Sequence, residues 1–361
     1  MDKSFAHNVL AWFDEHGRKN LPWQQNPHAY NTWVSEIMLQ QTQVATVIPY
    51  FEKFMSAFPD VITLANADQD EVLKHWAGLG YYSRARNLHA AAKQVRDEFK
   101  GIVPDDLDAL ISLSGIGRST AGAILSLAYQ QPQAILDGNV KRVLTRYHAV
   151  SGWTGKSAVL KTLWSLAEAH LPTDQTGQSN QPNPHKQRNA DYTQAMMDLG
   201  ATLCTRTKPT CLICPLQEGC KALKQGNPTD YPTPKPRKVV PDKYATMLLL
   251  INDDNDVLLE KRPSPGIWGG LWSLPQFDDQ QSAESWYENK YNHVFNHMEE
   301  LDSFSHTFSH FRLHVQPIKI KHSIQAKGVM EADDNLWYNS DTDFSGGLPA
   351  PIKKLFKRIQ L

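Results

Sequence analysis

Two carboxylates stand in surroundings that suit acid–base chemistry. Glu36 lies inside the apolar run Trp33–Leu39, where partial loss of water would raise its pKa. Asp137 opens the stretch Asp137–Asn139, just ahead of a cation-rich segment of helical periodicity, and a helix start favours an ionised carboxylate. Taken alone, an aspartate in this position is most often just the N-cap of that helix.

The segment before Asp137 predicts a helix-hairpin-helix. Residues 106–113 and 119–129 show helical spacing of apolar residues, and the turn between them contains Gly115 and Gly117. Glycine suits positive φ or a close approach of another backbone, and the free N–H groups at the start of the second helix bind phosphate. A phosphate-binding hairpin with a carboxylate close behind it indicates chemistry on DNA.

All four cysteines lie close together, in the spacing C-x6-C-x2-C-x5-C at Cys204, Cys211, Cys214 and Cys220. A disulfide framework would normally spread its bridges along the chain, and a reducing cytosol disfavours one. Four thiolates in one compact loop hold either tetrahedral zinc or an iron–sulfur cluster, and the spacing alone does not choose between them. We therefore predict a metal centre of either kind.

These groups must be positioned by two different kinds of structure. Residues 1–224 have helical periodicity and predict an all-α domain, and residues 225–243 hold five prolines and predict a stiff linker. Residues 244–361 predict an α+β domain. We expect its strands at 244–251, 257–260 and 311–320, and its helices at 283–293 and 348–359.

Several helix starts in the first domain carry recognisable capping residues. Thr32 precedes the apolar run around Glu36, Asp68 precedes Glu71 by three residues, and Asp191 precedes Gln194 by three. Each pattern predicts an N-cap. Residues 5–16, 43–58, 86–99 and 156–170 complete the expected helices, and residues 173–188 predict a polar loop.

The composition restricts where the protein acts and how it binds. The chain has 361 residues and a formal net charge of -1, so a DNA-binding surface must be a local basic patch. It has no apolar run of membrane-spanning length and no signal-peptide pattern at its start. We expect a cytoplasmic protein that associates with the nucleoid through DNA.

The hairpin, Asp137 and the cysteine spacing together resemble the endonuclease III superfamily of DNA glycosylases. Within that superfamily the chain is similar to the adenine DNA glycosylases of the MutY type. The similarity lies in residues 21–23 (LPW), 35–51, 78–88 (GLGYYSRARNL), 135–144 (ILDGNVKRVL), 194–204, 268–272 (WGGLW) and 306–311 (HTFSHF). It implies one 4Fe-4S cluster on the four cysteines.

The resemblance also implies roles for individual residues. Glu36 would be the general acid that protonates adenine at N7, and Asp137 would stabilise or trap the cationic sugar, as the second carboxylate does in glycoside hydrolysis. Adenine must be flipped out of the duplex. The implied base-contacting residues are Tyr81 and Gln41 in the vacated stack and Trp23, Asn139 and Gln194 in the base pocket.

Two further features refine the expected activity. Strand-cleaving relatives carry a lysine where this chain has Ser119, so a monofunctional enzyme that leaves an abasic site is implied. The C-terminal domain resembles a Nudix fold but lacks the glutamate-rich metal motif of Nudix hydrolases. The resemblance instead assigns Phe308, Ser309 and His310 to reading 8-oxoguanine; an ordinary strand edge is the alternative.

The predicted function is removal of adenine paired with 8-oxoguanine or guanine in double-stranded DNA by a monomeric enzyme. Three alternatives remain at this point. The first is a glycosylase/lyase for oxidised pyrimidines, which Ser119 argues against. The second is a non-catalytic or redox-sensing iron–sulfur DNA-binding protein, and the third is a Nudix hydrolase.

Overall fold

The computed structural model places the chain in two compact units. One unit comprises Met1–Asn66 and Asn87–Arg237, and the other comprises Ala67–Arg86 and Lys238–Leu361. The structure describes residues 4–172, 188–236, 239–263, 266–292, 298–308, 310–322, 335–339, 341, 344 and 346–361. The loop expected at 173–188 lies outside these ranges except for Arg188, and so does Ser309.

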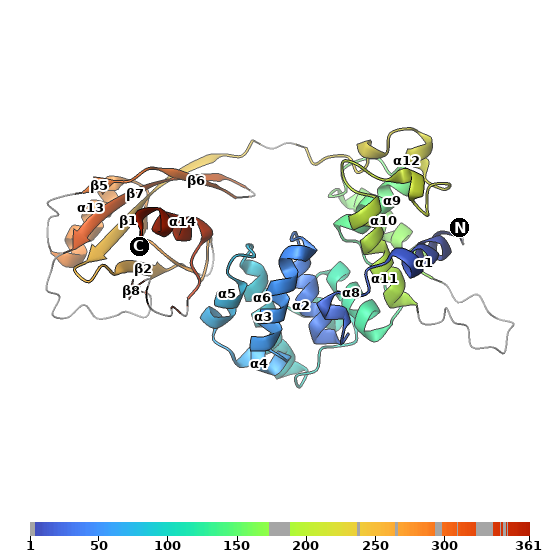
Figure 1. Cartoon of the computed structure of the whole chain (residues 1–361), viewed down its shortest axis with the longest axis horizontal. Helices are drawn as coiled ribbons and strands as arrows, with labels where there is room; N and C mark the ends of the chain where they lie inside the picture. The colour runs from blue at the N-terminus through green and yellow to red at the C-terminus, as the bar shows by residue number, and fades with distance from the viewer. Residues whose placement is uncertain are drawn as a thin grey trace. The chain divides into compact units, whose positions relative to one another are not determined.

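The first unit is helical throughout its described residues, as predicted, apart from one isolated bridge between Trp153 and Thr233. Its helices, labelled in Figure 1 where space allows, are α1 (Ser4–His16), η1 (Pro22–Gln24), α2 (Ala29–Leu39), α3 (Val44–Ala57), α4 (Val61–Asn66), most of α6 (Ser83–Glu98), α7 (Leu107–Ser112), α8 (Arg118–Tyr129), α9 (Gly138–His148), α10 (Ser157–Ala169), α11 (Asn189–Asp198), the π-helical η2 (Leu199–Leu203), η3 (Cys211–Ile213), α12 (Lys221–Lys224) and η4 (Pro228–Asp230).

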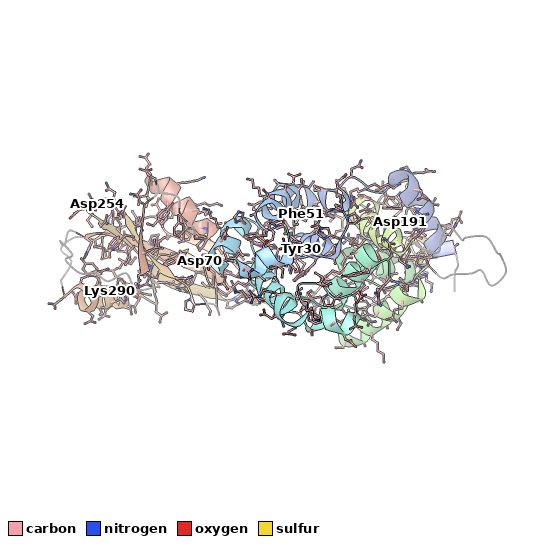
Figure 2. The ribbon with its side chains drawn as sticks, turned by 90° about the horizontal axis from the view of Figure 1, so that it is seen from below. Tyr30, Phe51, Asp70, Asp191, Asp254 and Lys290 are labelled. Carbon is pink, nitrogen blue, oxygen red and sulfur yellow. The ribbon has the colours of Figure 1, made fainter. Side chains whose placement is uncertain are left out.

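Apolar side chains from distant helices form the core of this unit. Phe5 on α1, Leu144 on α9, Leu163 on α10 and Leu199 on η2 belong to one buried cluster. Figure 2 labels Tyr30 and Phe51 in the helical unit, and both are buried. This core holds α9 and α11 together, and α8 contacts both α11 and α2. The three helices that carry the site described below are therefore fixed relative to one another.

Two of the expected caps were wrong, and the third was confirmed in its position only. The N-cap of α2 is His28, whose Nδ1 accepts from the Asn31 amide at 3.5 Å, so Thr32 lies within the helix. Asp68 does precede α5 (Gln69–Trp76), but its side chain makes no capping bond. Asp191 lies in the first turn of α11 rather than before it. Its carboxylate bonds to Arg188 at 2.9 Å.

The second unit is built on a mixed sheet, which confirms the predicted α+β class. Its strands are β1 (Asp242–Asn252), β2 (Val257–Lys261), β3 (Trp272–Ser273), β4 (Gln276–Phe277), β5 (Glu299–Glu300), β6 (Phe304–Thr307), β7 (Arg312–His322) and β8 (Asn335–Tyr338). The main path runs β3-β2-β1-β7-β5. β1 and β7 are parallel, in register from Asp242↔Arg312 to Asn252↔His322, and Figure 1 shows them as the long strands of the sheet.

The helices α13 (Gln280–Tyr291) and α14 (Ala350–Ile359) also belong to this unit. Tyr287 of α13 packs on Leu248, Leu250 and Ile318. Because every residue from Ala245 to Ile251 is buried, both faces of β1 must be covered. The predicted hairpin between the first two strands is confirmed by the antiparallel pairing of Ile251 with Val257.

The segment Ala67–Arg86, which lies inside the first domain expected from the sequence, belongs to the second compact unit. Asp70 on α5 pairs with Lys261 on β2 at 2.9 Å, and Arg86 Nη1 donates to the Gly269 carbonyl at 2.5 Å. Within the described ranges, no helix is both long and apolar enough to cross a membrane.

Candidate active site

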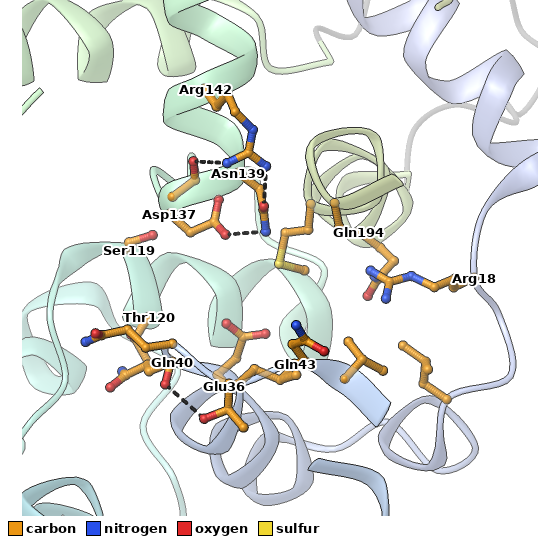
Figure 3. Close-up of a pocket in the computed structure, with 18 of the residues that line it drawn as sticks. Arg18, Glu36, Gln40, Gln43, Ser119, Thr120, Asp137, Asn139, Arg142 and Gln194 are labelled. Atoms are coloured by element: carbon orange, nitrogen blue, oxygen red, sulfur yellow. Dashed lines mark hydrogen bonds between the residues drawn. The ribbon is translucent and has the colours of Figure 1, made fainter. Parts of the chain in front are cut away.

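Glu36 and Asp137 line the same pocket, although 101 residues of chain separate them. The pocket has a volume of about 980 Å³. Glu36 comes from the second half of α2, and Asp137 is the residue that caps α9. Figure 3 shows both carboxyl groups directed into this space. The structure therefore brings together the two carboxylates that sequence analysis singled out.

Glu36 is held in its protonated form at neutral pH. Loss of water raises the pKa of Glu36 to about 8, and the negative charge of Asp137 contributes to the rise. The apolar neighbours along α2 explain the burial: Trp33, Val34 and Ile37 are each at most 3% exposed. A carboxyl group that keeps its proton near pH 7 can donate it to a leaving group.

Asp137 is both an N-cap and a member of the pocket, so the two explanations considered from sequence are not exclusive. Its Oδ1 accepts from the Val140 amide at 2.7 Å and its Oδ2 accepts from Asn139 Nδ2 at 3.0 Å. Burial raises the pKa of Asp137, while these hydrogen bonds and Arg142 act to lower it. The helix start favours the ionised form of Asp137, as expected from sequence, but burial opposes it and has the larger effect on the pKa.

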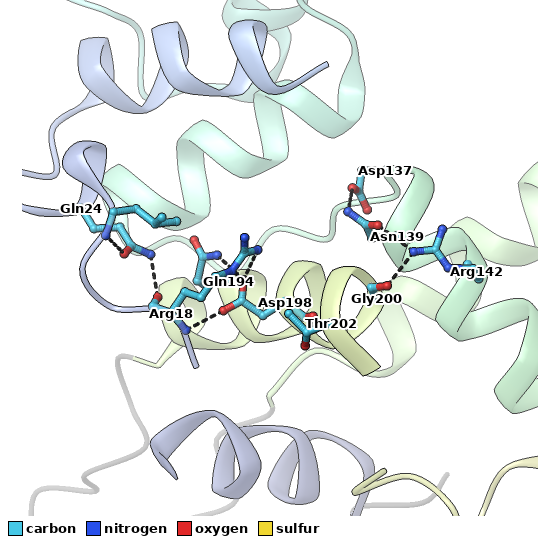
Figure 4. A network of polar contacts seen from close by, with 10 residues as sticks. Arg18, Gln24, Asp137, Asn139, Arg142, Gln194, Asp198, Gly200 and Thr202 are labelled. Carbon is cyan, nitrogen blue, oxygen red and sulfur yellow. Dashed lines mark hydrogen bonds and ion pairs between the residues drawn. The ribbon is translucent and has the colours of Figure 1, made fainter. Parts of the chain in front are cut away.

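A chain of hydrogen bonds links Asp137 to the cysteine loop. The Asn139 amide that donates to Asp137 also accepts from Arg142 Nη2, at 2.8 Å. Arg142 further donates to the carbonyls of Gly200 at 2.6 Å and Cys204 at 2.7 Å. Figure 4 shows the part of this chain from Asp137 to Gly200. The loop after η2 thus fixes the orientation of a pocket residue.

The four cysteines form a coherent donor set. Burial and the neighbouring thiols raise the pKa of Cys214 to about 11, and Cys204 also raises the pKa values of Cys211 and Cys220. Mutual electrostatic influence of this kind requires the four sulfur atoms to lie near one another. Buried Arg146 donates to Cys204 Sγ at 3.2 Å. The positive charge of Arg146 opposes the rise in the pKa of Cys211, and thiolate is the form that binds metal.

Among the described residues, no group of three or more His, Cys, Asp or Glu side chains is arranged as a site for a single metal ion. Cys204, Cys211, Cys214 and Cys220 are each intermediate in exposure. The choice between zinc and an iron–sulfur cluster rests on the sequence resemblance.

Of the other residues that sequence analysis singled out in the first domain, several line the pocket, whereas Tyr81 does not. The pocket lining includes Trp23, Gln41, Ser119, Asn139 and Gln194. Trp23 is buried and packs edge-on against Phe51. Gln41 is exposed in the turn that ends α2, with φ +58°. Tyr81 belongs to the second unit, where its side chain is 52% exposed.

The hairpin has the geometry that its sequence predicts. Gly115 has φ +78°, which favours glycine, and an added Cβ would meet Asn87 Cβ at 2.7 Å. Gly117 caps α8 and has open space around it. Ser119 Oγ accepts from the Leu136 amide at 2.9 Å. The hydroxyl of Ser119 thus supports the backbone immediately before Asp137.

Sequence analysis missed Arg18, which lines the pocket, and Asp198, which lies buried behind Arg18 and Gln194. Asp198 is 1% exposed and accepts four hydrogen bonds. Three come from Arg18 and the fourth comes from Gln194, as Figure 4 shows. Because Arg18 lies 180 residues away in the chain, no local pattern could have revealed the pair.

Phe308 and His310, two of the residues assigned to 8-oxoguanine, lie between β6 and β7 in the second unit. Phe308 follows β6, and its amide donates to the Phe311 carbonyl at 2.8 Å. Its ring packs against Trp268 and His306, with ring centroids 5.6 and 4.7 Å away. His310 is exposed. A clustered aromatic turn of this kind can stack on a base.

Comparison with known proteins agrees with this arrangement. Residues 34–169 match the HhH-GPD superfamily of base excision DNA repair proteins, and residues 246–358 match the NUDIX domain. The structure of a thermostable thymine-DNA glycosylase aligns with a TM-score of 0.53 at 26% identity, covering 62% of this chain and 97% of that one. The fold and pocket thus define a base-excision DNA glycosylase joined to a Nudix-like domain.

Full-length relatives specify the family. The chain is 40% identical to the adenine DNA glycosylase of Buchnera aphidicola subsp. Acyrthosiphon pisum, covering 99% of this chain and 97% of that protein. It is 29% identical to the human adenine DNA glycosylase, covering 99% of this chain and 74% of that protein. The chain belongs to the adenine DNA glycosylase family.

Proposed function

We propose that this enzyme hydrolyses the N-glycosyl bond of adenine paired with 8-oxoguanine or guanine in double-stranded DNA. The observation that carries the proposal is the shared pocket of Glu36 and Asp137, in which Glu36 has a pKa of about 8. Membership of the adenine DNA glycosylase family supports adenine as the base removed. The opposite base and the monomeric state rest on the sequence resemblance.

The two carboxyl groups have complementary tasks in this reaction. Neutral adenine is a poor leaving group, so Glu36 donates its proton to N7 as the glycosidic bond breaks. The sugar then carries positive charge, which ionised Asp137 stabilises or traps before water adds. The hydrogen bonds from Val140 and Asn139 hold Asp137 in place for this role. The base reaches the pocket by flipping out of the duplex.

Ser119 supports a monofunctional reaction. A lyase needs an amine at this position to form a Schiff base with the sugar, whereas the Ser119 hydroxyl bonds to the backbone of Leu136. The product is then an intact strand with an abasic site. This residue argues against the glycosylase/lyase alternative, because the pocket wall presents a hydroxyl where that chemistry needs a lysine.

We assign a 4Fe-4S cluster to Cys204, Cys211, Cys214 and Cys220. When bound, the cluster supplies a rigid cross-link among four points of the loop. Arg142 donates hydrogen bonds to both the Cys204 carbonyl and the Asn139 side chain, and Asn139 in turn orients Asp137.

The first domain, taken as residues 1–224, then holds both the pocket and the cluster. Residues 225–243 are the linker and 244–361 the recognition domain.

Phe308, Ser309 and His310 form the proposed 8-oxoguanine contact. The aromatic packing of Phe308 on Trp268 supports a stacking role. Tyr81 and Gln41 are proposed to fill the stack that the flipped adenine leaves. Both have left-handed backbone, with φ of +47° and +58°, and both side chains are exposed, which suits residues that insert into a partner.

Single-turnover base release tests the proposal. The substrates are matched duplexes with adenine opposite 8-oxoguanine, guanine or thymine, and a thymine-glycol duplex. We expect fast adenine release opposite 8-oxoguanine, slower release opposite guanine, little opposite thymine, and no strand break without alkali. Borohydride trapping of a stoichiometric enzyme–DNA adduct would contradict the monofunctional assignment. Release of thymine glycol would favour the oxidised-pyrimidine alternative.

A further inference from the structure

The buried carboxylate of Asp198 has a geometry that restricts its neighbour Gln194. Asp198 Oδ1 accepts from Arg18 Nε at 2.9 Å, Arg18 Nη2 at 2.6 Å and Gln194 Nε2 at 2.8 Å. Its Oδ2 accepts from the Arg18 amide at 2.8 Å. Arg18 and Gln194 line the pocket, whereas Asp198 lies behind them and is 1% exposed.

An ionised carboxylate can only accept hydrogen bonds. The amide of Gln194 must therefore direct its NH₂ group toward Asp198, because the opposite orientation would place two oxygen atoms in contact. This requirement removes the usual ambiguity between the two ends of an amide. The other end, the carbonyl oxygen Oε1, is left as an acceptor on the side away from Asp198.

Arg18 supplies hydrogen-bond donors beside this acceptor. A guanidinium has five N–H donors and no acceptor, and its pairing with Asp198 fixes the plane of the group. The pocket wall formed by Arg18 and Gln194 thus presents one obligatory acceptor next to obligatory donors. Without Asp198, the Gln194 amide could rotate and exchange the positions of its oxygen and its NH₂ group. The pocket wall would then present either an acceptor or a donor at this position.

This pattern distinguishes two purines that differ at position 6. Adenine carries an exocyclic amine, which donates, beside N1, which accepts. Hypoxanthine carries a carbonyl, which accepts, beside N1–H, which donates. An acceptor beside a donor matches adenine at both atoms and opposes hypoxanthine at both. Sites built on paired hydrogen bonds discriminate strongly, because the wrong base leaves buried groups unpaired.

We propose that Asp198 is the positioning residue that makes the pocket select a 6-amino purine, by fixing the orientation of the Gln194 amide. The inference rests on the proposed function, since it assumes that the excised base enters this pocket. It predicts a role in selectivity for a residue that touches no substrate atom.

The test compares single-turnover release of adenine and of hypoxanthine, each opposite the same base, by the full-length enzyme. Asp198→Ala is expected to lower the adenine-to-hypoxanthine ratio roughly tenfold or more, the size of one lost hydrogen bond. Asp198→Asn is expected to retain most of the ratio, because its oxygen can stay at the crowded Oδ1 position. Asp191→Asn, at a half-buried acid on the same helix that pairs with Arg188, is the matched control and should leave the ratio unchanged.

Gln194→Leu provides a second arm. If Asp198 acts through Gln194, the ratio of the double variant Asp198→Ala/Gln194→Leu should equal that of Gln194→Leu alone, so the two effects are not additive. An Asp198→Ala enzyme that is slower on both bases at an unchanged ratio would show a merely structural role. That result would overturn the inference.

Removing Asp198 leaves Arg18 unpaired, which can prevent folding. In that case Arg18→Met/Asp198→Asn is compared with Arg18→Met/Asp198→Leu; neither pair leaves a buried charge, and only the first keeps an acceptor for Gln194. A higher ratio for the first supports the inference, and equal ratios overturn it. A wild-type enzyme that releases no adenine would overturn the proposed function as well, whereas selective wild type with an equally selective Asp198→Ala overturns this inference alone.

Discussion

The burial of Glu36 lowers the stability of the fold, but it also prepares this residue for catalysis. An acid whose pKa is higher in the folded than in the unfolded chain costs stability once it ionises. For Glu36, with a folded pKa of about 8, the cost appears above its ordinary pKa, grows until pH 8 and stays constant beyond it. The protein retains this cost because the same burial keeps the proton available for the leaving base.

Replacing Glu36 by glutamine should therefore separate activity from stability. We expect Glu36→Gln to abolish adenine release and to raise the melting temperature, with a gain that increases from about pH 5 to pH 8. Thermal unfolding at several pH values and single-turnover assays measure the two effects. Glu52→Gln, at an exposed position on α3, serves as the control. A Glu36→Gln enzyme that stays active would exclude this residue as the acid.

The rate of base release should follow the protonation state of both carboxyl groups. Glu36 must hold its proton, so the rate of the chemical step should fall as pH rises through about 8. Asp137 must be ionised, and because its pKa is raised, the rate should also fall at acidic pH. Single-turnover rates across the pH range measure the profile. A rate that stays constant well above pH 8 would contradict proton donation by Glu36.

At the scale of secondary-structure elements, the π-helical segment η2 sets the position of Asp137. Gly200 on η2 lies directly against the start of α9: a Cβ added at Gly200 would meet Asn139 Cβ at 2.5 Å and Asn139 Cα at 2.9 Å. Only glycine permits this approach, since the atoms that would have to move include backbone. The close packing lets the Gly200 carbonyl accept from Arg142.

Substitution of Gly200 should therefore displace α9. We expect Gly200→Ala to lower stability by roughly 1–3 kcal/mol through overpacking and to slow adenine release by moving Asn139 and Asp137. Gly138→Ala is the matched control for stability, because an added Cβ there has open space. Thermal unfolding and single-turnover rates give the comparison. Equal stability of the two variants would show that this contact is not tight.

Much of this element structure could be predicted from the sequence, for identifiable reasons. The hairpin, α9 and the β1–β2 hairpin were predicted because apolar periodicity and turn residues are local signals. The caps of α2 and α11 were misjudged because both helices begin before Thr32 and Asp191, whereas Asp68 does cap α5 but makes no side-chain capping bond. Asp198 and Arg18 were missed because their pairing spans 180 residues. Glu36 and Asp137 were found individually, but only the fold shows that they share a pocket.

At the scale of the whole molecule, the chain is not divided simply into an N-terminal and a C-terminal part. The second unit recruits Ala67–Arg86, and this segment carries Tyr81. Arg84, which is 8% exposed, donates to the carbonyls of Leu79 and Gly80, and its guanidinium lies 5.6 Å from the ring centre of Tyr81. The tyrosine proposed to enter the DNA stack is thus supported by the unit that carries Phe308.

This organisation predicts a pattern of local stability. We expect Lys261→Ala, which leaves partly buried Asp70 without its ion pair, to speed hydrogen exchange in residues 67–86 and in β2, and to leave α9 unchanged. Lys319→Ala, which removes an ion pair with Glu299 elsewhere on the same sheet, is the control. Exchange measured by mass spectrometry resolves these segments. Faster exchange in α9 but not in residues 67–86 would contradict the assignment of that segment.

The central claim is that Glu36 and Asp137 act together on adenine. Its most direct test is single-turnover release of adenine opposite 8-oxoguanine by wild-type enzyme, Glu36→Gln and Asp137→Asn, with DNA binding measured in parallel. We predict rapid release by wild type, near-complete loss in both variants, and retained binding of the duplex. Unchanged release by either variant, or no release by wild type, would contradict the account.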